Sequence, residues 1–343
     1  MIRRNAAAFG LAGIMMVAGV AMAADDEAVV NVYSSRHYDT DTALYDTFTE
    51  ESGIEVNLIE GDADELIERI KLEGENSPAD VLITVDAGRL YRAEEAGILQ
   101  PVESEVLNER IPENLRHPDG LWYGLTRRVR AIVRSTERTG EDEIARYEDL
   151  AEPAFENRVC IRSSSNIYNQ SLVASMIESQ GLEAAEAWAE GLVANMARPP
   201  QGGDTDQIRA VAAGECDVAV VNHYYLVRML EGDDEADREA ARAVEIVFPN
   251  QDGRGAHANI SGAGVVAGAP HPENAVRFLE YLTSPEAQAQ FAFGNFEYPV
   301  VEGVKLDPAL EAFGSFQTDD VNASRYGANN AEAVRMMDRA GWR

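Results

Sequence analysis

Basic residues are scarce in this sequence, which has 29 Lys and Arg against 60 Asp and Glu and a formal net charge of −31 at pH 7. A chain this acidic lacks the basic face with which proteins neutralise phosphates, so we exclude nucleic acid as a partner. We interpret the dispersed carboxylates as a solvated surface, because charge raises solubility and says little about fold. Their number therefore does not by itself predict a cation site.

Long apolar runs are also lacking. The apolar stretch at residues 6–20 contains three glycines and is shorter than the roughly 20 residues that span a bilayer. It follows Arg3 and Arg4 and precedes an A-x-A pattern at residues 21–23, which together predict a secretory signal peptide at residues 1–23. No cysteine follows the cleavage site, so we exclude a lipid anchor there and expect a soluble, exported protein.

Cysteine is limited to Cys160 and Cys216. Each lies on a strand-like segment and precedes a tyrosine by eight residues, so neighbouring parallel strands would bring the two cysteines into register. An exported protein can form disulfides, and we predict one here, which would stabilise the fold by roughly 4 kcal/mol in the chain-entropy model. The alternative is a pair of buried free thiols. A catalytic thiol is disfavoured because no positioned histidine partner is evident.

Short apolar, β-rich runs alternate with amphipathic helical patterns, which predicts an α/β fold. The expected strands are residues 29–33, 54–59, 80–84, 158–161, 217–221 and 260–266, and the principal helices are 41–52, 63–73, 87–96, 170–180, 183–197, 207–213, 271–284, 285–293 and 331–340. The length suffices for two lobes. Apolar runs at 121–126 and 131–134 flank the basic cluster of Arg127, Arg128 and Arg130, where we expect the chain to cross between the lobes.

Three tyrosine-bearing segments each follow a strand-like run. They are YSSRHYDT at residues 33–40, SSNIYNQS at 164–171 and NHYYLVRM at 222–229. Ligands of open α/β sheets bind at the carboxyl ends of the strands, so the three segments can converge there. We place the adjacent Tyr224 and Tyr225 in a loop, because successive strand residues point to opposite faces whereas a loop can aim both inward.

A convergence of phenols favours a strongly charged metal ion. The candidate ligands are His37, Tyr38, Tyr168, Tyr224 and Tyr225. A phenol has an ordinary pKa near ~10, so only a strong Lewis acid keeps several of them deprotonated at neutral pH. Ferric iron meets this requirement better than the common divalent metals, because it is small, hard and trivalent.

These segments resemble those of the ferric-iron-binding periplasmic proteins of ABC transporters, especially the tyrosine-rich branch that needs no synergistic anion. The likeness is densest in VYSSRHY, CIRSSSNIYNQSLVASMI, RPPQGGDTDQIRAVAAGECD and VNHYYLVRML. It implies a two-lobed periplasmic-binding-protein fold of type II, with a mixed, mostly parallel sheet flanked by helices in each lobe and a cleft between them. It also implies a monomeric periplasmic protein that carries Fe(3+) as transported ligand to an inner-membrane permease driven by a cytoplasmic ATPase.

The resemblance also assigns roles to individual residues. Tyr38, with His37 beside it, would come from a first lobe of residues 29–126 and 252–300. The other three tyrosines would come from a second lobe of residues 127–251 and 301–343. Arg128 and Arg228 match arginines that stabilise the phenolates. The residue before the tyrosine pair, His223, is an unusual occupant of its position.

Two other functions stay open at this stage. A binding protein of the same fold could take an organic solute or an oxyanion, with the tyrosines stacking on it or hydrogen-bonding to it. An exported enzyme is the second alternative, but the sequence has no G-x-S-x-G elbow and no H-E-x-x-H zinc helix, so we predict no enzymatic activity.

The remaining tyrosines and histidines have less specific expectations. A lone tyrosine is usually half-buried with its hydroxyl in water, and a lone histidine here is expected on the surface or in a loop. The tyrosines concerned are Tyr91, Tyr123, Tyr147, Tyr281, Tyr298 and Tyr326, and the histidines are His117, His223, His257 and His271.

Overall fold

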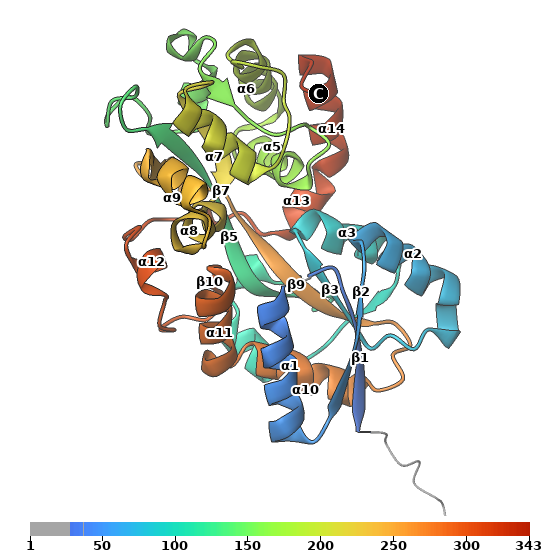
Figure 1. Ribbon diagram of the computed structural model, residues 1–343. Helices are drawn as coiled ribbons and strands as arrows, with labels where there is room; N and C mark the ends of the chain where they lie inside the picture. The colour runs from blue at the N-terminus through green and yellow to red at the C-terminus, as the bar shows by residue number, and fades with distance from the viewer. Residues whose placement is uncertain (1–27, 37) are drawn as a thin grey trace, which may run out of the picture.

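A computed structural model describes residues 28–36 and 38–343, in which one mixed β-sheet runs through the molecule (Figure 1). The strand order is β2-β1-β3-β9-β5-β7-β6, with β4 paired to β9 and with β8 and β10 paired to β5. The strands are β1 Val29–Ser34, β2 Glu55–Glu60, β3 Val81–Val85, β4 Leu99–Gln100, β5 Tyr123–Ser135, β6 Val159–Cys160, β7 Val218–Asn222, β8 Val244–Val247, β9 Ala258–Val266 and β10 Tyr298–Pro299.

The pairing is parallel at both ends of the sheet and antiparallel in the middle. β1 pairs in parallel with β2 and β3, and β6 with β7, since each connection runs through helices. The long strands β5 and β9 are antiparallel to each other and to their other neighbours. β5 pairs with β9 near its start and with β7 near its end, so it joins the two parts of the sheet. We call these the β1 side and the β7 side.

The segment where the chain was expected to cross between lobes belongs to one long strand. Arg127, Arg128 and Arg130 lie inside the continuous strand β5 and not between two shorter strands. A strand can carry these side chains because each has an acceptor: Arg127 donates to a backbone carbonyl, and the other two donate to buried carboxylates.

Helices cover both faces of the sheet (Figure 1). Those of the β1 side include α1, α2, α3, α10 and α11, and those of the β7 side include α5 to α9, while α14 packs on α5 and α6. The helices are α1 Asp39–Ser52, α2 Ala63–Glu73, α3 Ala87–Glu95, α4 Glu105–Arg110, α5 Ile167–Gln180, α6 Leu182–Ala194, α7 Asp204–Ala213, α8 His223–Glu231, α9 Glu235–Arg242, α10 Pro272–Leu282, α11 Pro285–Asn295, α12 Pro308–Glu311, α13 Ser324–Ala328 and α14 Asn330–Ala340.

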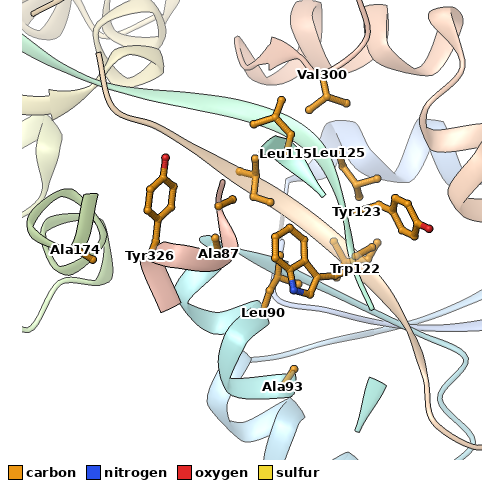
Figure 2. Close-up of a cluster of buried hydrophobic side chains, with 14 of the residues drawn as sticks. Ala87, Leu90, Ala93, Leu115, Trp122, Tyr123, Leu125, Ala174, Val300 and Tyr326 are labelled. Atoms are coloured by element: carbon orange, nitrogen blue, oxygen red, sulfur yellow. The ribbon is translucent and has the colours of Figure 1, made fainter. Parts of the chain in front are cut away.

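The hydrophobic core is continuous where β5 pairs with β9. Figure 2 shows Leu90 and Ala93 of α3, Trp122 just before β5, and Tyr326 of α13 gathered beside these two strands. All four are buried, and full burial of a large apolar side chain contributes about 1.5–3 kcal/mol. α3 therefore packs on the sheet where the two sides meet. In the part of the chain that the structure describes, no helix is long and apolar enough to cross a bilayer.

Cys160 and Cys216 form a disulfide with a Cα–Cα distance of 5.9 Å, which confirms the predicted pairing. The cysteines meet because β6 and β7 are parallel neighbours in which Cys160 is paired with Ala219. The predicted signal peptide at residues 1–23 lies outside the described residues.

Several aromatic side chains expected near water are buried instead. Tyr147 donates a hydrogen bond to the carbonyl of Arg130, and Tyr326 donates to Asp319 at 3.0 Å. These two phenols can be buried because each hydroxyl has an acceptor, which sequence could not reveal. His117 and His257 lie in loops, as predicted, although both side chains are buried.

Candidate metal site

Three helix N-termini carry the singled-out tyrosines. Tyr38 is the N-cap of α1, Tyr168 lies in the first turn of α5, and Tyr224 and Tyr225 lie in the first turn of α8. The loop predicted for the last pair is wrong, since α8 begins at His223 directly after β7. A helix N-terminus carries a partial positive charge that favours anions, so each tyrosine lies where a phenolate is stabilised.

The tandem tyrosines pack on each other in this first turn. Their ring centroids are 4.4 Å apart with an interplanar angle of 29°. Tyr224 is only 1% exposed and its hydroxyl is buried. Adjacent helical residues normally diverge, so this stacking keeps both phenols together beside the N-terminus of α8.

The four phenols influence one another electrostatically. Burial raises the pKa of Tyr224 well above its usual value, and the neighbouring phenols of Tyr168, Tyr225 and Tyr38 raise this pKa further. Burial also raises the pKa of Tyr225, followed by the effects of Tyr168 and Asp204. The structure therefore brings all four tyrosines into one cluster, in which deprotonation requires added positive charge. His37 lies outside the described residues.

Arg228 lies between tyrosines from the two sides of the molecule. Its guanidinium carbon is 4.7 Å from the ring centroid of Tyr38 and 4.8 Å from that of Tyr224. Among the described residues no carboxylate forms a salt bridge with Arg228, whose Nη2 donates to the carbonyl of Asn295 at 3.5 Å. Its positive charge is thus directed mainly at the phenols.

Arg128 is buried on β5 beside the same cluster. Its guanidinium carbon is 5.9 Å from the ring centroid of Tyr224. Burial lowers the pKa of Arg128, but Glu297 and the phenols of Tyr38, Tyr224 and Tyr168 more than offset this effect and leave the pKa raised. Arg128 therefore stays charged, and both arginines singled out in the sequence lie beside the tyrosines.

Three further arginines were missed at the sequence level. Arg36 lies 4.8 Å from the ring centroid of Tyr38, and Arg162 and Arg130 lie 5.5 and 5.9 Å from that of Tyr168. For Arg36 and Arg162 the available signal was closeness to a tyrosine segment along the chain, since Arg36 belongs to the SSRHY motif and Arg162 lies two residues before SSNIYNQS. Arg130 had only its membership of the basic cluster as a signal.

Glu297 fixes two of these arginines and was also missed. Its oxygens accept from Arg36 Nη1 at 2.9 Å and from Arg128 Nε at 2.7 Å. Burial raises the pKa of Glu297, but the two arginines outweigh it and lower the pKa to about 2. The preceding residue, Phe296, has φ 57° in the left-handed region, which is uncommon for a side chain of this size. No local sequence pattern announces such a carboxylate.

His223 is buried and not on the surface as predicted. Its Nδ1 accepts from the Val129 amide at 3.1 Å, and its Nε2 lies 2.9 Å from the carbonyl of Phe296, to which it must donate. Burial lowers the pKa of His223 to about 4. Both ring nitrogens are occupied, so His223 supports α8 against β5 and β10 and presents no free nitrogen to the phenols.

Comparisons with known proteins identify relatives of this chain. Residues 76–317 match the family model described as bacterial extracellular solute-binding protein. Iron uptake protein A1 of Synechocystis sp. is 53% identical over 318 residues, which cover 93% of this chain and 88% of that protein. The Fe(3+)-binding periplasmic protein of Serratia marcescens is 28% identical, with 96% of each chain covered.

Solved structures show the same likeness. A Trichodesmium protein (IdiA, FutA) in complex with iron and citrate ligands is 57% identical, with a TM-score of 0.90 and coverage of 92% of this chain and 100% of that one. Apo FutA2 from Synechocystis is 51% identical, with a TM-score of 0.89 and the same coverage. Sequence, fold and relatives together show that this chain belongs to the family of bacterial extracellular solute-binding proteins.

Proposed function

We propose that this protein captures ferric iron in the cleft between its two lobes and delivers it to a membrane permease. The observation that carries the proposal is the cluster of four phenols at three helix N-termini, surrounded by arginines. The relatives named for iron uptake and for Fe(3+) binding support the same ligand. An organic solute or oxyanion is not favoured, because it would leave the clustering of four phenols without a reason.

The proposed ligands are the phenolates of Tyr38, Tyr168, Tyr224 and Tyr225, with His37 as a fifth. Ferric iron prefers hard anionic oxygens over thiolates and neutral donors, so its affinity for such a set exceeds that of softer ions. Three or four phenolates roughly neutralise its charge, which permits a closed and partly desolvated cleft. Ferrous iron would leave excess negative charge, so reduction is expected to weaken binding and to offer a route of release.

Arg128 and Arg228 have the proposed role of stabilising the phenolates. A nearby positive charge favours the ionised form of a phenol and lowers its pKa. The helix N-termini act in the same direction. Each phenol loses a proton on binding, so loading releases protons and weakens as the pH falls.

The two sides of the molecule are proposed to be the lobes that close over the metal. We assign residues 29–126 and 252–300 to the first lobe and residues 127–251 and 301–343 to the second. On this proposal the protein is exported by the signal peptide at residues 1–23 and works in the periplasm as a monomer. Its partner is an inner-membrane ABC permease with a cytoplasmic ATPase, and it has no catalytic role.

Metal uptake by the purified protein tests the proposal. Metal-free protein titrated with a weak ferric chelate should develop a visible phenolate-to-iron charge-transfer band. Tyr225→Phe should weaken this band, whereas Tyr281→Phe, on the distant helix α10, should leave it unchanged. A wild-type protein that stays colourless and takes up no ferric iron would refute the proposed function.

A further inference from the structure

Helix α3 of the β1 side meets helix α5 of the β7 side close to the tyrosine cluster. Asp86, the N-cap of α3, accepts a hydrogen bond from the hydroxyl of Ser171 on α5 at 2.6 Å. Ser171 follows Tyr168 by one helical turn, so both project from neighbouring positions on one face of α5. The contact therefore joins the two sides of the molecule immediately beside a proposed iron ligand.

The backbone of Asp86 is strained. Its φ is 82° and its ψ 127°, a region that non-glycine residues rarely adopt. Strain of this kind persists where surrounding contacts enforce it, and it is concentrated at functional sites. Here the Asp86 amide donates to the carbonyl of Ile260 at 2.8 Å, and Asp86 Oδ1 accepts from the Gly88 amide at 2.9 Å. These contacts hold the carboxylate directed toward Ser171.

The other carboxylate oxygen of Asp86 is not used by the contact with Ser171. Oδ2 is buried, has no hydrogen-bond partner among the described residues, and belongs to a side chain that lines a small cavity. Arg128, Arg130 and Tyr168 line the same cavity. The negative charge of Asp86 thus lies among arginines that surround the tyrosines, which connects the interlobe contact to the metal site.

Two glycines allow α3 to approach its partners this closely. A Cβ atom on Gly88 would lie 3.2 Å from Cδ1 of Ile167 on α5. A Cβ atom on Gly327 of α13 would lie 2.0 Å from Cβ of Tyr91 on α3. α13 also packs on α5, so α3 packs against a surface formed by α5 and α13.

We propose that Asp86 is a positioning residue that latches the cleft shut through Ser171, an inference that rests on the proposed function. The bond holds α5, and with it Tyr168, against the β1 side. Opening the cleft must break it, so the latch slows metal release. A hydrogen bond to a charged acceptor is strong enough for its loss to change the release rate by about tenfold.

Release of ferric iron to excess chelator, followed through the visible band, tests the latch. Ser171→Ala should release iron about tenfold faster than wild type. Ser175→Ala is the matched control, because Ser175 is equally buried on α5 and its hydroxyl donates to Leu172 of the same helix at 2.8 Å. Asp86→Asn keeps a side-chain oxygen that can accept from the Gly88 amide of α3 but removes the negative charge. The release rate of this variant should therefore lie between those of wild type and Ser171→Ala. The melting temperature of the metal-free protein should be the same for both serine variants, which a merely structural role would not predict.

A distance measurement separates failure of the latch from failure of the proposed function. Spin labels at Leu72→Cys on α2 and Leu182→Cys on α6 occupy sites that are 84% and 52% exposed and report the separation of the two sides. Ser171→Ala should populate longer distances than wild type or Ser175→Ala. Equal release rates and equal distances in the two serine variants would overturn the latch. If wild type binds no ferric iron, the proposed function fails. The latch fails if wild type never populates the short distance between the labels, or if Ser171→Ala leaves the population of that distance unchanged.

Discussion

Replacement of Arg228 by glutamine tests how the site stabilises phenolates. Arg228 lies 4.7 Å from the ring centroid of Tyr38 and 4.8 Å from that of Tyr224, which come from opposite sides of the molecule. Glutamine keeps a polar side chain of similar reach but removes the charge. The expected result is weaker ferric iron binding without loss of the fold.

The expected loss of ferric iron affinity can be calculated from the charges that Arg228 and the two phenolates carry. Two unit charges about 5 Å apart attract by roughly 3 kcal/mol at an effective dielectric constant of about 20. Arg228 is half-buried, so solvent screening and its own desolvation reduce each interaction to about 1 kcal/mol. Two phenolates then account for about 2 kcal/mol, or about 30-fold in affinity.

Competition titrations against one ferric chelator at several pH values measure this effect. Without Arg228 the phenols hold their protons more tightly, so the pH at which half of the iron is bound should move upward. Arg277→Gln, on the exposed face of α10, is the control and should behave like wild type. An Arg228→Gln protein with wild-type affinity and an unshifted pH profile would refute the electrostatic reasoning.

Three further predictions concern the ligands, the disulfide and the buried carboxylate. Tyr38→Phe should weaken iron binding less than Tyr225→Phe in the same titrations, because the second lobe supplies three tyrosines and can hold iron in an open cleft; equal losses would contradict sequential closure. Replacing Cys160 and Cys216 by serine should lower the free energy of unfolding by roughly 4 kcal/mol in urea titrations, and an unchanged midpoint would contradict this. Glu297→Gln should cost about 3–5 kcal/mol at neutral pH, because it leaves buried arginine charge unpaired. Since the pKa of Glu297 is lowered to about 2, its contribution is present above the unfolded value of about 4.3 and is lost as the pH falls through 2. The free energies of unfolding of wild type and variant should therefore approach each other as the pH is lowered from about 4.3 to about 2. A difference between them that does not change with pH would contradict the role assigned to Glu297.

Sequence periodicity predicted the elements that depend on local pattern. The helix predicted at residues 63–73 has these bounds in α2, and the disulfide followed from matched spacing on neighbouring parallel strands. Boundaries failed where tertiary contacts replace local signals. The loop predicted for Tyr224 and Tyr225 is the first turn of α8, which follows β7 directly. Its first residue, His223, is held by contacts with the distant Val129 and Phe296, and the N-cap Asn222 makes no side-chain capping hydrogen bond.

By itself, the sequence determined the α/β class, the covalent pairing of its two cysteines and the identity of four tyrosines that follow strands, because spacing and residue chemistry are local properties. Only the tertiary structure decided which charges meet those tyrosines. Glu297 lies 261 residues from Arg36 along the chain yet within 2.9 Å in space, and Asp86 meets Ser171 across 85 residues. These contacts form because strands and helices from both sides of the sheet pack together. Packing between residues distant in the chain produces no periodic pattern in the sequence.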